Sequence, residues 1–262
     1  MSKEYKIYLK RQKKRNFLIH TTRIIILLLI IIIWQILANN NIINAFITSS
    51  PNEIVKTILS LAKQNNLLPH IYTTTYETII SFILGTLLGI IIAIILWYNK
   101  FLAKVIDPYL TVLNSLPKVS LGPILIIWFG ANIKSIIIMA ILVSVIVTII
   151  TIYNAFKETD ITKINLLKSF GANKLQILKY LIIPANYPTI ISSLKISISQ
   201  SLIGVIMGEL LVSKKGIGYL IMYGSQVFNL NLVASGIIIL MLVSYIMYLI
   251  ITYIEKILIK HN

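Results

Sequence analysis

The sequence predicts an all-α membrane protein with six transmembrane helices, both termini in the cytoplasm, and a cytoplasmic coupling-helix loop between spans four and five. Composition, the length of the apolar runs and the distribution of basic residues support this fold class. Of the 262 residues, 57% are hydrophobic and only 12% are charged, whereas a soluble domain carries roughly a quarter charged residues. Lipid must therefore cover much of the surface.

Six apolar segments are long enough to cross a bilayer, which requires about 20 residues. We expect helices because lipid offers no partner for unpaired backbone groups, and the runs lack the alternation of a barrel strand. The first segment follows a basic stretch, as in a signal peptide, but lacks a small-x-small cleavage site and is expected to stay uncleaved. The predicted spans are Phe17–Ala38, Tyr76–Tyr98, Val105–Phe129, Ser135–Tyr153, Thr189–Val212 and Leu232–Ile254.

Lysine and arginine orient these spans. With the N-terminus inside, the inner segments carry 17 basic residues and the outer segments carry 5. Because basic residues accumulate in cytoplasmic loops, both termini are expected inside. The net charge of +16 then reflects topology, and without an aromatic-plus-basic RNA-binding motif no nucleic acid is expected as a partner.

The outer connection, residues 39–75, contains the start signal of a helix. Ser50 and Glu53 have capping-box spacing, and Pro51 occupies the first helical position. Apolar residues follow at helical spacing from Ile54. Two interpretations remain open, an interfacial helix on the outer leaflet or a docking surface for a partner.

The inner connection, residues 155–188, is too polar to span the membrane. Asp160 is expected to cap a short helix that ends at Gly171. A second short helix is predicted from Asn173 to Pro184, with its apolar face formed by Leu175, Leu178 and Ile182. Two amphipathic helices hinged at a glycine indicate contact with a partner protein.

The segment from Phe170 to Pro184 resembles the EAA loop of ABC-importer permeases. That loop has a glycine, nine residues and an aliphatic-x-aliphatic-proline ending, matched here by Gly171, Leu181, Ile183 and Pro184. The name-giving Glu-Ala-Ala positions depart from the family and read Asn165, Leu166 and Leu167. The resemblance implies a site that couples to cytoplasmic ABC ATPase subunits, formed by Asn165, Leu166, Leu167, Gly171, Ala172, Leu181, Ile183 and Pro184.

Two further motifs resemble the nitrate/sulfonate/taurine branch of these permeases, residues 116–130 in the third span and residues 208–221 around the end of the fifth. The resemblance covers roughly residues 51–256. It implies a permease core at 51–262, preceded at 1–50 by the basic N-terminus and the first span. It also implies a bacterial inner-membrane location, an extracytoplasmic substrate-binding protein, and a second copy of the chain in a homodimer.

No catalytic, metal or cofactor site is expected. The sequence has no Walker phosphate loop, no His-Glu-x-x-His and no nucleophile elbow. It also lacks cysteine, which removes thiolate ligands and nucleophiles. ATP hydrolysis is therefore expected from a separate subunit.

Polar residues within the spans are the candidates for the solute pathway, because they are costly in lipid. These are Lys118, Ser197, Gln200 and Glu209. Each also has a structural interpretation. The structural alternative for Glu209 is pairing with Lys214 or Lys215, and that for Lys118 is contact with carbonyls freed by neighbouring prolines. Glu77 is expected to be a charge at a helix N-terminus.

The resemblance implies a permease that moves a small solute, with nitrate, sulfonates and taurine as examples. The alternative is an ion-coupled secondary transporter or channel. Such proteins usually contain internal repeats, and none is found between the two halves of this sequence.

Overall fold

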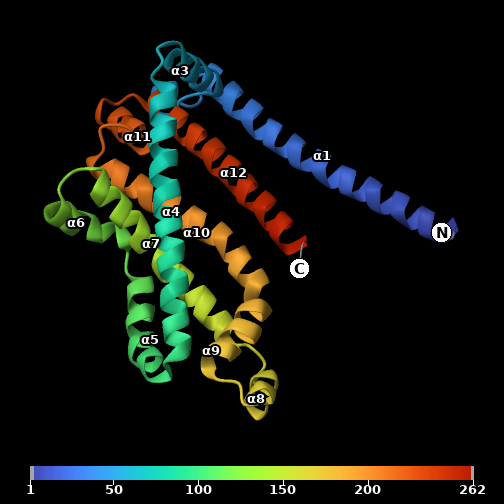
Figure 1. Ribbon diagram of the computed structural model, residues 1–262. Coiled ribbons are helices and arrows are strands. Elements are labelled where there is room, and N and C mark those ends of the chain that lie inside the picture. Colours follow the sequence, from blue (N-terminus) through green and yellow to red (C-terminus); the bar gives the residue numbers. More distant parts are fainter. Residues whose placement is uncertain (1–2, 261–262) are drawn as a thin grey trace.

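The computed structural model describes residues 3–260, and all regular elements in that range are helices (Figure 1). Two are not α-helical, the 3-10 turn η1 and the π segment η2. The elements are α1 (Lys3–Asn39), α2 (Ala45–Thr48), α3 (Pro51–Lys63), α4 (Leu67–Tyr98), α5 (Lys100–Ser115), η1 (Lys118–Leu121), α6 (Gly122–Phe129), α7 (Ile133–Lys157), α8 (Ile161–Ser169), α9 (Lys174–Ile177), η2 (Leu178–Ile182), α10 (Ile183–Val212), α11 (Ile217–Gln226) and α12 (Leu230–Lys260).

Helix α7 forms the centre of the bundle, packed between α4 and α10. Small residues allow this close approach, as is common between membrane helices. A Cβ on Gly89 of α4 would lie 2.6 Å from Thr148 Cγ2 of α7, and one on Gly204 of α10 would lie 2.5 Å from the Cα of Ala140. The small-residue stripes of α4 and α10 therefore serve packing within one chain.

Within residues 3–260, five helices are long and apolar enough to span a membrane, and a bent pair supplies a sixth crossing if it is counted as one span. The prediction of a continuous third span at Val105–Phe129 is wrong. Helix α5 and the η1–α6 segment meet at 95°. Pro117 lacks an N–H, and it holds Leu116 in the extended region at ψ 137°. Hydropathy falls at this bend, where Asn114, Ser115 and Lys118 interrupt the apolar run, and the prolines at 117 and 123 also indicate a break.

The second span also begins earlier than expected. Helix α4 starts at Leu67, nine residues before the predicted start at Tyr76. The prediction that Glu77 is a charge at a helix N-terminus is therefore wrong. Glu77 lies well inside α4, where it is 1% exposed. Three threonines, residues 73–75, precede Tyr76 and lower the local hydropathy. The predicted span therefore began after them and omitted the first turns of the helix.

The predicted outer helix is present as α3. The Ser50 hydroxyl accepts the N–H of Glu53 at 3.4 Å, and Pro51 occupies the first turn. Ile54 is buried, and its carbonyl accepts the hydroxyl of Ser235 in α12 at 3.3 Å. The apolar face of α3 thus packs on the chain's own last helix.

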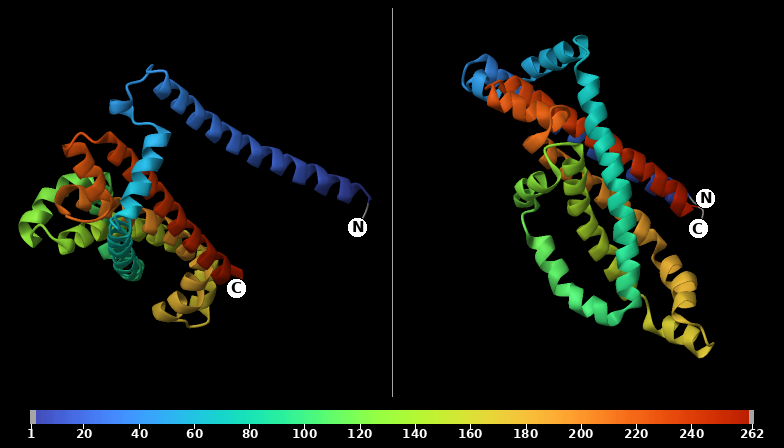
Figure 2. Two further views of the ribbon diagram at one scale, coloured as in Figure 1. Left: turned by 90° about the horizontal axis from the view of Figure 1, so that it is seen from above. Right: turned by 60° about the vertical axis from the view of Figure 1, so that its left-hand side comes forward.

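Helix α1 extends away from the other helices (Figures 1 and 2). None of its most apolar stretch is buried within the chain. Its C-terminal end is held to α3, where the Gln35 side chain accepts the N–H of Asn52 at 3.0 Å. From Ile24 to Ile33, α1 presents apolar side chains to its surroundings.

Candidate functional site

Helix α8 begins and ends as the sequence predicts. The Asp160 carboxylate accepts the N–H of Thr162 at 2.8 Å, and this contact lowers the pKa of Asp160. At the other end Gly171 has φ +81°. Its N–H donates to Lys168 O at 2.9 Å, and the N–H of Ala172 donates to Leu167 O at 3.0 Å. This is a Schellman ending, which favours glycine.

The second predicted helix does not end at Pro184. It starts at Asn173, whose side chain forms a capping box with Gln176, and continues through the π segment η2 into α10 as one stretch from Lys174 to Val212. Pro184 lies in the first turn of α10. Because proline cannot donate a backbone hydrogen bond, a local π arrangement lets the helix continue past it.

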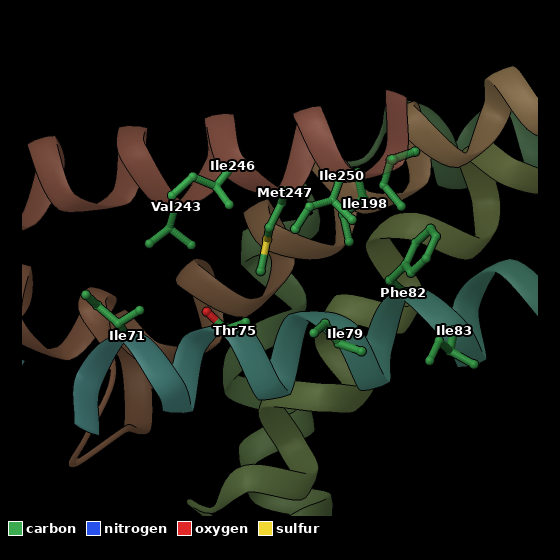
Figure 3. A pocket seen from close by; sticks show the side chains of 11 residues that line it. Ile71, Thr75, Ile79, Phe82, Ile83, Ile198, Val243, Ile246, Met247 and Ile250 are labelled. Atoms are coloured by element: carbon green, nitrogen blue, oxygen red, sulfur yellow. The ribbon is translucent and has the colours of Figure 1, made fainter. Parts of the chain in front are cut away.

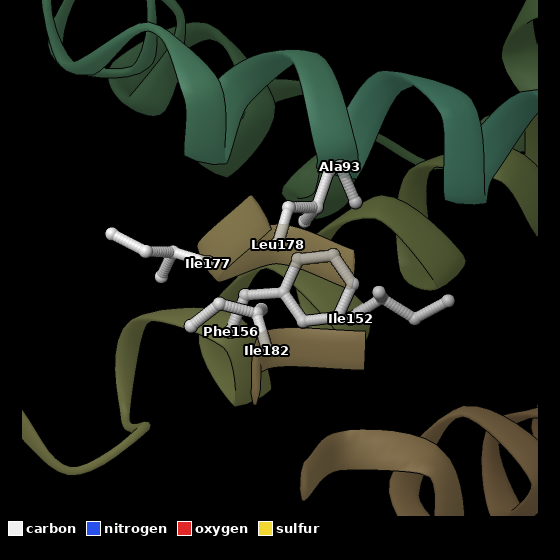
Figure 4. Packing of buried hydrophobic residues seen from close by; sticks show 6 residues of the cluster. All are labelled: Ala93, Ile152, Phe156, Ile177, Leu178 and Ile182. Atoms are coloured by element: carbon white, nitrogen blue, oxygen red, sulfur yellow. The ribbon is translucent and has the colours of Figure 1, made fainter. Parts of the chain in front are cut away.

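The inner face of this segment is fixed to the ends of two spans (Figure 4). Ile177, Leu178 and Ile182 pack with Ala93 of α4 and with Ile152 and Phe156 of α7. The predicted residues Leu167, Ala172, Leu181 and Ile183 are partly buried against the same cluster. Leu175 was assigned to this apolar face, but it points outward and is exposed, and Ile177 takes its place.

The outer face carries apolar side chains without cover. Phe170 is 77% exposed, and Leu166, Leu175 and Tyr180 are also largely exposed. Asn165 and Pro184 are exposed as well, and a Cβ on Gly171 would have no neighbour within 4 Å. We call residues 160–184 the coupling segment. It has one face anchored to α4 and α7 and one face free.

The predicted pathway residues do not form a common site. Ser197 is buried, with its hydroxyl 2.7 Å from that of Thr148, so it links α10 to α7. Gln200 is half-buried on α10. Lys118 lies at the bend between α5 and α6, where its ammonium donates to Asn114 O at 3.4 Å. It contacts a backbone carbonyl near the end of α5, in agreement with the interpretation that Lys118 binds carbonyls beside the prolines.

Glu209 is 1% exposed and fixes the turn between α10 and α11. One carboxylate oxygen accepts the Thr74 hydroxyl at 2.6 Å, and the other accepts the N–H of Gly218 at 2.6 Å. The predicted pairing with Lys214 or Lys215 is not found, since neither takes part in an ion pair among residues 3–260. Glu209 instead binds α4 and the backbone of α11.

The same turn uses residues that the sequence did not single out. Thr74 accepts the N–H of Ile217 at 2.8 Å, and His70 Nδ1 accepts the N–H of Gly216 at 2.9 Å. Glu77 is a neighbour of Glu209. We call Glu209 with these residues of α4 and the α10–α11 turn the Glu209 cluster. The α4 partners Thr74 and His70 are 135 to 146 residues from the turn residues that they contact, so no local pattern indicates them, whereas Gly218 is nine residues from Glu209.

Two cavities lie along α12. One, of about 320 Å³, is enclosed by α4, α10 and α12, and its side chains are almost all apolar, with Thr75 as the exception (Figure 3). The other is a groove of about 750 Å³ between α10 and α12. Its lining is mostly apolar, and Ser199, Ser244, Tyr245 and Tyr248 are among the lining residues. The hydroxyl of Ser199 donates to Lys195 O at 3.0 Å within α10.

Comparison with known proteins identifies the family. Residues 85–260 match the binding-protein-dependent transport system inner membrane component. The chain belongs to this family. A protein of Haemophilus influenzae described as an ABC transporter permease is 27% identical over 82% of this chain and 87% of its own length. One of Bacillus subtilis described as an aliphatic sulfonates transport permease is 28% identical over 79% and 75%.

The fold also matches solved permeases. An inward-facing structure of the MetNI methionine ABC transporter superposes with a TM-score of 0.65, covering 73% of this chain and 95% of that chain at 16% identity. The chain is therefore the multi-pass permease subunit of an ABC transport system, and ATP hydrolysis belongs to a separate subunit. The resemblance to ABC-importer permeases drawn from the sequence is confirmed.

Proposed function

We propose that this permease is coupled to its ATPase through residues 160–184 and imports a small organic anion. The proposal for the coupling site rests on the two different faces of the coupling segment. Its inner face is packed on α4 and α7, and its outer face leaves Leu166 and Phe170 uncovered. A push on the outer face passes directly into α10, because η2 and α10 are continuous with α9.

Co-purification with the cognate ATPase tests this site. Phe170→Asp places a charge in the proposed contact, and we expect loss of the ATPase from the purified complex and loss of uptake. Phe170→Tyr keeps the ring and is expected to retain both. The side chain is exposed, so neither change should alter the stability of the permease itself. Equal ATPase recovery with the Asp and Tyr variants would contradict the coupling site.

Both termini are proposed to lie in the cytoplasm, on the same side of the membrane as the coupling segment. Two of the inner segments predicted from basic residues meet there, since Lys100 and Lys174 line the same cavity. Helix α3 and helix α11 lie at the opposite end (Figure 1). That end would receive the substrate-binding protein.

A homodimer is proposed because the resemblance to ABC-importer permeases implies two copies of the chain, and because α1 extends away from the other helices, where a second copy can lie beside it (Figure 2). A second copy would cover this helix by two-fold symmetry. Co-expression of two differently tagged copies tests the assembly, with recovery of both tags on one affinity resin as the expected result. Recovery of one tag alone would exclude the homodimer.

The solute is proposed to be an aliphatic sulfonate or a similar anion with an apolar body. This rests on the Bacillus subtilis relative and on the groove between α10 and α12, where hydroxyls adjoin aliphatic side chains. Uptake of radiolabelled alkanesulfonates by the reconstituted system, in competition with nitrate and taurine, identifies the solute. A solute that moves without ATP would instead favour the secondary-transporter alternative.

A further inference from the structure

A cavity of about 230 Å³ lies where the coupling segment meets the ends of α4, α5 and α7. Four lysines line it, one each from α5, α7, α8 and α9: Lys100, Lys157, Lys168 and Lys174. No acidic side chain is among its lining residues. Side chains from four separate elements thus bring like charges to one place.

These charges have little compensation within the chain. Among residues 3–260 the ion pairs join Lys56 to Glu53 and Lys195 to Glu255, so none of the four lysines is paired. Lys174 approaches Tyr98, with its ammonium 3.5 Å from the carbonyl oxygen and 5.3 Å from the ring centroid. Of the acids beside the cavity, Asp160 is engaged as the cap of α8, and Glu158 is exposed and forms no ion pair among residues 3–260. An anion that enters the cavity would therefore be attracted by four ammonium groups that have no paired carboxylate.

The rest of the lining is apolar and aromatic. Trp97 and Tyr98 end α4, and Tyr153 lies one turn before the end of α7. Such residues mark the membrane–water interface in spanning helices. Phe156 and Ile177 form the buried floor. The cavity therefore combines an apolar lining, which we call the apolar bed, with four nearby ammonium groups.

We propose that this cavity binds the phosphate headgroup of an anionic phospholipid. The lysines take the phosphate, and the aromatic and aliphatic lining takes the glycerol and the first methylene groups of the acyl chains. A free phosphate ion matches the charges but not the apolar bed. A lipid in this place contacts both the spans and the coupling segment, and so holds the segment at a fixed depth. This last effect rests on the proposed function, whereas lipid binding does not.

Lipid retention by the purified permease, without ATPase, tests the binding. The protein is reconstituted in nanodiscs of mixed phosphatidylglycerol and phosphatidylcholine, extracted mildly, and its bound lipid is measured by native mass spectrometry. Lys168→Gln/Lys174→Gln is expected to reduce retained phosphatidylglycerol by about tenfold. The matched control Lys163→Gln/Lys179→Gln removes two charges from the same segment outside the cavity and should retain the lipid.

A second pair of substitutions separates binding from folding. Lys100→Gln/Lys157→Gln leaves the Lys174–Tyr98 contact in place and is also expected to lose the lipid, with an unchanged thermal midpoint. Equal loss in the control pair would overturn the proposal, because general surface charge would then explain retention. Displacement of the lipid by millimolar inorganic phosphate would also overturn it, in favour of a free-anion site. A permease that retains lipid but fails to bind its ATPase refutes only the proposed function.

Discussion

The two ends of the bundle use polar residues in opposite ways. At the α10–α11 turn, Glu209, Thr74 and His70 accept or donate hydrogen bonds within the chain, and one carboxylate oxygen of buried Glu77 is left without a partner. At the coupling segment, lysines and large apolar side chains are left without partners. The difference indicates a rigid end that keeps its own shape and an opposite end prepared for contacts outside the chain.

The largest expected effect compares two glycines with positive φ, Gly216 at +111° and Gly171 at +81°. A Cβ on Gly216 would overlap the Glu209 carboxyl, whereas one on Gly171 has open space. Gly216→Ala adds left-handed strain and a clash and should cost about 2–5 kcal/mol. Gly171→Ala adds strain alone, about 1–2 kcal/mol. Reversible unfolding in mixed detergent and SDS measures both, and equal costs would remove the distinction between the two ends.

A smaller loss is expected when the Glu209 cluster loses its acceptor. Glu209→Ala leaves the Gly218 N–H and the Thr74 hydroxyl buried without a partner, which should cost about 2–4 kcal/mol. Glu53→Ala is the control, because its ion pair with Lys56 is exposed and is worth at most about 1 kcal/mol. The same unfolding assay applies. An unchanged stability of Glu209→Ala would mean that the carboxylate is kept for solute transport.

The smallest expected effect is local and concerns the cap of α8. Asp160→Ala should increase amide hydrogen exchange in the first turn of α8 and leave global unfolding unchanged, because the helix is exposed. The pKa of Asp160 is lowered by the N–H of Thr162. The cap is therefore fully present above the ordinary pKa of aspartate and is lost as pH falls through the lowered value. Exchange in α8 that does not respond to acid would contradict this role.

Local chemistry made the coupling segment predictable. Asp160 and Gly171 act on their immediate neighbours, so the sequence alone identified both ends of α8. Hydropathy is also a property of neighbouring residues, so the approximate positions of the membrane spans were predictable from it. The continuation from α9 into α10 was missed because Pro184 normally ends a helix, and only a π segment lets the helix pass.

The Glu209 cluster and the bend in the third span were not predictable in this way. Glu209 was compared with the lysines next to it, but its partner Thr74 is 135 residues away. A signal was present in the two glycines after Glu209, since Gly218 packs against its side chain. The prolines at 117 and 123 are signals for a helix break, but they do not give the 95° turn of the chain. Tertiary packing decides such features.

Thiol labelling of two single-cysteine variants tests the central claim, that the coupling segment is a cytoplasmic contact for the ATPase. The chain contains no cysteine, so Phe170→Cys and Leu68→Cys each carry one reactive site. Phe170 lies in the coupling segment and Leu68 lies in the first turn of α4, and both side chains are exposed. A membrane-impermeant maleimide should label Leu68→Cys in intact spheroplasts. Phe170→Cys should react only in inverted vesicles and be protected by the bound ATPase. Labelling of Phe170→Cys from outside, or equal labelling with and without the ATPase, would contradict the account.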